Sequence, residues 1–97
     1  MRAIHAFRIA ADHPCLPGHF PGRPIVPGVL LLDRALQALA AETRLPEPLR
    51  LSRVKFMGPL APGELATVLV DEPRNGRLAF ACDGRDGRIL QASVDLA

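Results

Sequence analysis

The sequence predicts an α+β fold in which an antiparallel β-sheet wraps around one long, central, apolar helix. One continuous apolar segment, residues 28–43, has the length of a helix and few polar positions. Several later segments alternate apolar and polar residues, as half-buried strands do. Glycine and proline separate these segments, and a chain of 97 residues fits one domain that spans residues 1–97.

The first half of the chain holds a strand, a loop and the helix. Residues 4–10 predict a short strand, and five prolines then exclude regular structure between residues 12 and 27. The helix begins at about Gly28, and Pro46 and Pro48 end it. Because this helix is apolar on nearly every side, we expect it to lie in the middle of the structure.

The second half predicts four strands, at residues 50–57, 64–71, 77–83 and 88–96. Asn75-Gly76 is a hairpin signal, since both residues tolerate the positive φ of a type I′ turn. Residues 83–87 indicate a second hairpin. The alternation in the last strand fits a sheet with one face on the core and one face in water.

Composition excludes several classes of protein. Eleven of the twelve basic residues are arginines scattered along the chain, so we expect no nucleic-acid binding. Cys15 and Cys82 form no CxxC pair and the three histidines lack zinc spacing, so we expect a reduced cytoplasmic protein without a metal or cofactor. No apolar run approaches the ~20 residues that span a membrane, and the N-terminus has no signal-peptide pattern.

The candidate functional residues lie in the segment GHFPGRPIVPGVLLLD, residues 18–33. This segment places His19 and Asp33 at the two ends of a backbone that prolines and glycines restrict, which indicates proton-transfer chemistry. An imidazole with a pKa near neutrality suits a general base, and a buried unpaired carboxylate in an apolar helix is costly. Alternatively, His19 is a structural loop residue and Asp33 pairs with an arginine such as Arg23.

The same segment closely resembles the active-site signature of the 3-hydroxyacyl-acyl-carrier-protein dehydratases (FabA/FabZ type), which have the hotdog fold. Residues 54–64, VKFMGPLAPGE, resemble the family's strand and PxxPGD/E turn, and residues 83–92 resemble its final hairpin. The chain departs from longer members because it lacks most of their N-terminal strand and helix. The Asp33 position holds Glu in the FabZ branch and Asp in the FabA branch. The chain also resembles dehydratase-like domains of aryl polyene and other specialised clusters.

The resemblance implies an enzyme that dehydrates a 3-hydroxyacyl group on acyl carrier protein to a trans-2-enoyl thioester. His19 would remove the proton next to the thioester carbonyl, and Asp33 would protonate the departing hydroxyl. The Gly28 amide would stabilise the charge that develops on the carbonyl oxygen; alternatively, Gly28 only permits a turn after Pro27. The implied substrate-binding residues are Phe20, Pro27, Gly28 and Val29.

The resemblance also implies two partners, the acyl carrier protein and a second copy of the chain. In the family, the histidine and the acid come from different subunits, and an exposed sheet edge on a short chain fits a homodimer. The acyl chain would run along the helix, and the possible lining residues, each equally consistent with plain core, are Phe20, Leu31, Leu32 and Phe56. Two alternatives stay open: a hotdog thioesterase whose carboxylate activates water, and a non-catalytic module that binds acyl carrier protein.

Overall fold

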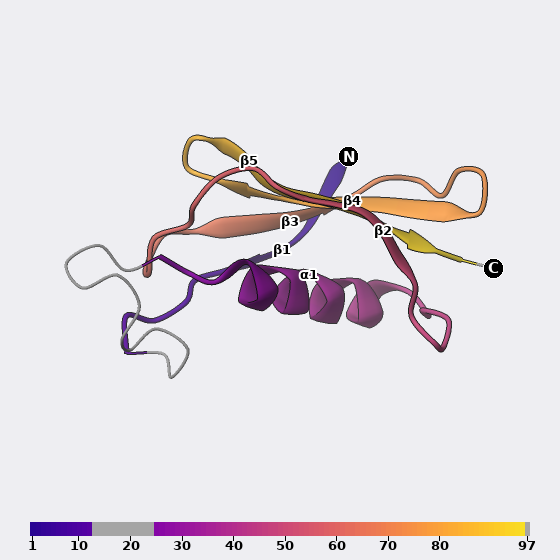
Figure 1. The fold of residues 1–97 in the computed structure, drawn as a ribbon, viewed down its shortest axis with the longest axis horizontal. Coiled ribbons are helices and arrows are strands. Elements are labelled where there is room, and N and C mark those ends of the chain that lie inside the picture. Colours follow the sequence, from indigo (N-terminus) through magenta and orange to yellow (C-terminus); the bar gives the residue numbers. More distant parts are fainter. Residues whose placement is uncertain (13–24, 97) are drawn as a thin grey trace.

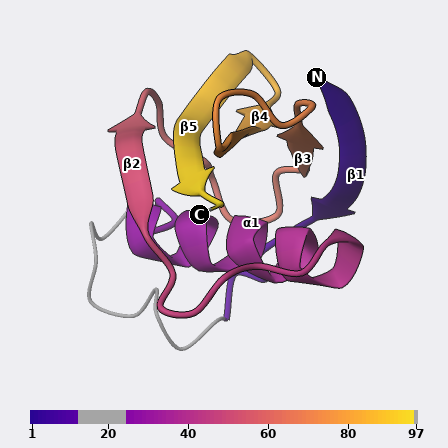
Figure 2. The same ribbon diagram turned by 90° about the vertical axis from the view of Figure 1, so that its right-hand side faces the viewer.

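A computed structural model describes residues 1–12 and 25–96 (Figure 1). Its elements are β1 (Arg2–Phe7), α1 (Gly28–Glu42), β2 (Leu51–Phe56), β3 (Ala66–Val70), β4 (Arg77–Gly84) and β5 (Gly87–Asp95). The five strands form one antiparallel sheet in the order β1-β3-β4-β5-β2. Figure 2 shows the sheet curving over one side of α1, with β1 and β2 at its two edges. The predicted α+β architecture is confirmed.

The ends of the elements differ from the prediction by a few residues. The first strand was expected at residues 4–10, but β1 covers Arg2–Phe7. Pairing explains this shift, because Phe7 lies opposite Ala66, where β3 begins, and among the described residues no strand pairs with residues 8–10. The Gly63 amide donates instead to the Ile9 carbonyl at 2.8 Å.

The turn after β3 has the predicted type I′ conformation. Asn75 and Gly76 have φ angles of 53° and 74°, and both angles are positive as this turn requires. Arg74 and Arg77 exchange two backbone hydrogen bonds of 2.9 Å across it. The second predicted hairpin is also present, since Gly84 pairs with Gly87 where β4 meets β5.

The core lies between the helix and one face of the sheet. Alternate residues of β3 are buried, as the sequence pattern predicted. The helix contributes one stripe to this core, spaced as a helical face requires: Leu31, Ala35, Ala38 and Leu39. The opposite side of α1 is open, since Asp33 and Gln37 are exposed and Val29 is 76% exposed. The expected arrangement of a sheet around one central helix is confirmed, and the five described strands cover one side of that helix.

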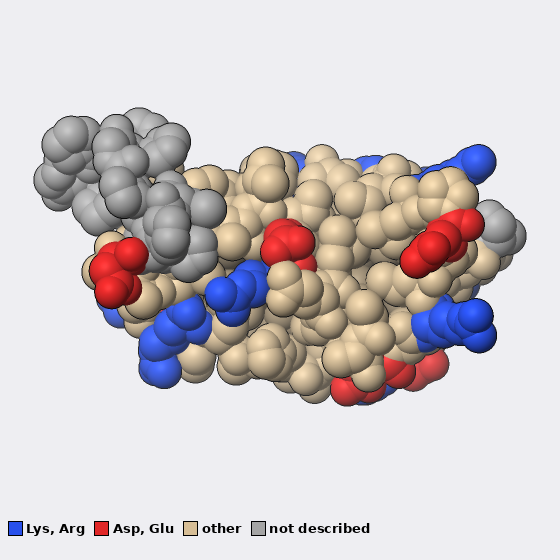
Figure 3. Space-filling view, turned by 90° about the horizontal axis from the view of Figure 1, so that it is seen from below, with Lys and Arg blue, Asp and Glu red and all other residues tan. Residues whose placement is uncertain are grey.

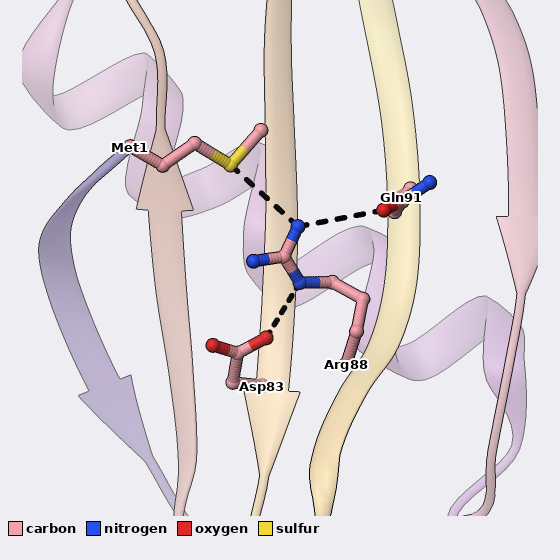
Figure 4. Close-up of polar contacts among 4 residues, drawn as sticks. All are labelled: Met1, Asp83, Arg88 and Gln91. Atoms are coloured by element: carbon pink, nitrogen blue, oxygen red, sulfur yellow. Dashed lines mark hydrogen bonds and ion pairs between the residues drawn. The ribbon is translucent and has the colours of Figure 1, made fainter.

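Polar contacts on the sheet hold the first residue of the chain beside β4 and β5 (Figure 4). The Arg88 guanidinium donates to the Asp83 carboxylate at 2.6 Å and to Gln91 Oε1 at 3.4 Å, and its Nη1 lies 3.8 Å from the Met1 sulfur. Next to them, Cys82 is buried, and this burial, with a smaller effect of the Asp83 charge, raises the pKa of its thiol to about 12. Cys82 is therefore an unreactive core residue at neutral pH.

Candidate active site

An apolar groove opens where α1 begins, and we call it the α1 groove. Its volume is about 620 Å³, and its walls come from the first turn of the helix and from the segment that follows β2. The lining residues are Ile25, Val26, Gly28, Val29, Leu31, Phe56, Met57, Gly58 and Pro59. A groove of this size with mostly apolar walls suits a small organic ligand with an acyl portion.

Close contact with Phe56 explains why residue 28 is a glycine. A Cβ atom on Gly28 would lie 2.8 Å from Cε1 of the Phe56 ring, closer than carbon atoms can pack. The backbone that carries this ring is held because Phe56 pairs with Leu90 and the Met57 amide donates to the Ile89 carbonyl at 2.8 Å. Gly28 therefore allows the ring to lie against the start of the helix, which is a packing role beyond a simple turn after Pro27.

The first two residues of α1, Gly28 and Val29, line this groove. No side chain of a described residue caps the helix, and the Pro27 carbonyl accepts from the Leu30 and Leu31 amides at 3.0 and 3.3 Å. Within the described part of the chain, the amides of Gly28 and Val29 have no hydrogen-bond acceptor. Such amides carry the partial positive charge of a helix N-terminus, which favours an oxygen that gains negative charge.

Asp33 lies on the exposed side of α1 and not among the residues that line the α1 groove. Its Oδ2 accepts a hydrogen bond from Gln37 Nε2 at 2.7 Å, one helical turn away. It lines a different groove of about 540 Å³, between α1 and the chain that leads to β2. Acidic side chains are few on this face of the molecule, which is largely uncharged (Figure 3).

Arg34 is the neighbouring arginine of Asp33 in the sequence, and it lies within the described residues. Arg34 places its guanidinium 5.8 Å from the centre of the Phe7 ring, so it faces β1 and does not pair with Asp33. Arg23, the other candidate partner, lies outside the described residues, as do His19 and Phe20. The predicted geometry between His19 and Asp33 therefore stays a prediction.

Four of the predicted substrate-contacting or lining residues do meet in the α1 groove: Gly28, Val29, Leu31 and Phe56. Pro27 sits at the N-cap, and Leu32 is partly buried against the core. The sequence reasoning did not select Ile25 or the Met57-Gly58-Pro59 segment. A signal for that segment was present, because the PxxPGD/E motif that the chain resembles begins at Pro59.

Comparisons with known proteins assign the chain to a family. Residues 1–93 match the ApeI-like family, which is described as ApeI dehydratase. The chain belongs to the ApeI-like dehydratase family. Within residues 1–12 and 25–96, no helix of this family member is long and apolar enough to cross a membrane.

Curated relatives of this ApeI-like chain are dehydratases of the FabZ type. The 3-hydroxyacyl-[acyl-carrier-protein] dehydratase FabZ of Bartonella quintana is 28% identical over 107 residues, covering 99% of this chain and 69% of the relative. The FabZ of Haemophilus influenzae is 34% identical over 83 residues, covering 74% of this chain and 56% of the relative. The match therefore covers little more than half of the second relative.

A solved structure supports the fold of this ApeI-like chain. A chain of the dehydratase heterocomplex ApeI:P from Xenorhabdus doucetiae superposes with a TM-score of 0.70 at 24% identity, covering 99% of this chain and 96% of that chain. The predicted hotdog fold is confirmed.

Proposed function

We propose that the protein is a hydro-lyase that converts a 3-hydroxyacyl group on acyl carrier protein into a trans-2-enoyl thioester. The observation that carries this proposal is the α1 groove, which Gly28 and Val29 at the start of α1 line together with apolar side chains, in a member of the ApeI-like dehydratase family. The apolar walls suit an acyl chain, and the amides suit a thioester carbonyl.

The proposed chemistry is removal of a proton at the α-carbon and loss of the β-hydroxyl as water. His19 acts as the base that takes the α-proton. The Gly28 amide, with Val29 next to it, donates to the thioester oxygen while the carbonyl gains enolate character. Asp33 donates a proton to the leaving hydroxyl, which departs as water, and the electron pair of the broken C–H bond forms the new double bond.

The position of Asp33 supports a site shared between two copies of the chain. Asp33 is exposed on the open side of α1, in a groove between the helix and the chain that leads to β2, so the described residues leave its carboxylate accessible. The edge strand β2 and its continuation expose Val54 (39%), Phe56 (50%) and Met57 (43%), and two of these residues also line the α1 groove. A second copy on the β2 edge would cover apolar surface and bring its own histidine loop to this groove.

The direct test is mass spectrometry of a 3-hydroxybutyryl acyl carrier protein incubated with the protein. We expect the acyl group to lose the mass of one water, and His19→Gln to lower the rate about 100-fold or more. His5→Gln is the matched control, because His5 is an exposed histidine on β1, away from the α1 groove.

Asp33→Asn should lower the rate in the same way, while Gln37→Leu, which removes only its hydrogen-bond partner, should change it less. Full activity of the His19→Gln variant would refute the proposed base. Release of the free carrier thiol without an enoyl product would instead identify a thioesterase.

A further inference from the structure

We propose that Arg53 is a positioning residue for the α1 groove: the left-handed backbone at this residue turns the Phe56 ring toward the helix, where the ring binds the acyl chain. The inference rests on the proposed function, since the acyl chain is that of the proposed substrate. Arg53 lies inside the edge strand β2, three positions before Phe56, and does not itself line the groove.

A regular strand could not turn both large apolar residues of β2 toward the helix. Successive side chains of a strand alternate between its two faces, so residues on one face are an even number of positions apart. Leu51 and Phe56 are five positions apart. Yet Leu51 pairs with Val94, a core residue, so it faces the core. Phe56 pairs with Leu90, which also lies in the core. One extra position must therefore separate Leu51 from Phe56.

A β-bulge in the middle of β2 supplies this extra position. The pairing with β5 shifts between Ser52 and Lys55. Arg53 and Val54 therefore lie together opposite Ala92 alone, which is one residue more than a regular ladder holds. Arg53 has a φ angle of 55°, a left-handed conformation that is unfavourable for residues other than glycine. The fold accepts this unfavourable backbone at the position where the two faces of the strand change over.

Arg53 contributes its backbone conformation and not its charge. Its side chain is exposed, and within the described residues its guanidinium forms no ion pair. The left-handed residue shortens the strand by one pairing position, and the alternation of faces then starts again one residue later. The residue therefore acts on the groove through the direction in which the following side chains point.

Without the bulge, the segment after Arg53 would face the opposite way. Lys55 would lie opposite Leu90 and point toward the helix, and Phe56 would turn to the outer face of the sheet. In the structure Phe56 instead lies so close to Gly28 that a Cβ atom there would be 2.8 Å from its ring. The ring lines the α1 groove and is 50% exposed, so it is available to a ligand.

The place of the ring suits the part of the acyl chain next to the thioester. Gly28 and Val29, whose amides have no acceptor among the described residues, line the same groove as the ring. A substrate whose thioester oxygen binds these amides would lay its acyl carbons against Phe56. Each buried methylene group strengthens binding about fourfold. Loss of the ring should therefore weaken the binding of long acyl chains more than that of short ones.

Nuclear magnetic resonance tests the position of the ring without any need for activity. The wild-type protein should show a nuclear Overhauser effect between the Phe56 ring protons and the Gly28 Hα protons. Arg53→Val should remove this contact, because a β-branched residue strongly disfavours a positive φ and the strand would pair without the bulge. Arg53→Gly should keep it, because glycine adopts this φ without strain. Arg50→Val is the matched control, since Arg50 precedes β2 and has no positive φ.

Removal of the extra residue should rescue the valine variant. When Val54 is deleted from Arg53→Val, one residue is left opposite Ala92, so the strand pairs regularly and Phe56 faces the helix again. The contact with Gly28 should return in this variant, including when Arg53→Val alone does not fold. Persistence of the contact in Arg53→Val, its loss in Arg53→Gly, or its absence from the rescued variant would each overturn the proposal.

Kinetics test what the ring does for the substrate. We compare 3-hydroxyoctanoyl and 3-hydroxybutyryl groups on pantetheine, and take the ratio of their kcat/KM values. Arg53→Val should lower this ratio about tenfold, mainly through KM of the longer substrate, and the variant without Val54 should recover it. An unchanged ratio in a variant that has lost the ring contact would refute the role of the ring in acyl binding. Failure of the wild-type protein to convert either substrate would overturn the dehydratase proposal instead, and the resonance experiment still decides whether Arg53 positions the ring.

Discussion

The two edge strands of the sheet differ in what they present to solvent. β1 carries exposed Arg2 and His5, which discourage pairing with another strand. Both edges have a register shift, between Ala3 and His5 in β1 and between Ser52 and Lys55 in β2, so this feature does not distinguish them. β2 also carries charges, but its exposed Val54 and Phe56 continue into the α1 groove. The two edges therefore differ in exposed apolar surface, and the proposed second copy is expected on β2 and not on β1.

The largest expected effect comes from a charge on the β2 edge. Val54→Asp should convert a dimer to a monomer and lower dehydratase activity about 100-fold or more, because two carboxylates would be buried near a two-fold axis. Size-exclusion chromatography with light scattering measures the mass. Ala3→Asp on β1 is the control and should change neither property. An active wild-type monomer would contradict the assignment of β2 as the interface edge.

A medium effect is expected where β2 contacts the helix. Gly28→Ala places a methyl group against the Phe56 ring, so we expect it to lower the free energy of unfolding by about 1–3 kcal/mol and to weaken substrate binding. Urea denaturation and KM measure the two effects. Phe56→Leu removes the ring atoms in conflict, and the double variant should recover part of the lost stability. Additive losses in the double variant would show that the ring is not the obstacle.

The smallest effect on stability is expected from Glu64, in the turn that links β2 to β3. Its carboxylate accepts the Arg85 amide at 2.8 Å and the Ala61 amide at 3.2 Å, and these contacts lower its pKa in the folded state. The stabilising effect is therefore present above the ordinary pKa of about 4.5 and is lost as the pH falls below that value. Glu64→Gln should lower Tm by a few degrees at pH 7 and by less at pH 3. Glu72→Gln makes the same chemical change outside this turn and should leave Tm unaltered at both values.

Much of the fold was predictable because local chemistry decides it. Asn75-Gly76 adopts the expected turn for a backbone reason that no distant residue can override, and the prolines before Gly28 limit where α1 can begin. The end of β1 was harder, since it depends on where β3 starts, about sixty positions later in the chain. The open side of α1 was not predicted, because apolar periodicity cannot show whether a surface is covered by the same chain or by another.

The site was predictable in part. The sequence pattern selected Gly28, Val29 and Phe56, which meet in the α1 groove. It did not reveal that the Phe56 ring is the reason for a glycine at position 28, since residues of β2 and α1 that are far apart in the sequence meet only through the fold. Nor did it show that Asp33 bonds to Gln37 and lines a groove other than the α1 groove.

The strand order has a consequence for how the molecule forms. β3, β4 and β5 are consecutive and pair with their neighbours in sequence, whereas β1 and β2 reach partners far along the chain. Contacts between segments far apart in the sequence form late in folding and are lost early in unfolding. We therefore expect the backbone amides of β3, β4 and β5 to exchange with solvent more slowly than those of β1 and β2. β2 forms its contacts late and has exposed apolar residues, so binding of a second copy would stabilise it. We therefore expect the melting temperature to rise with protein concentration.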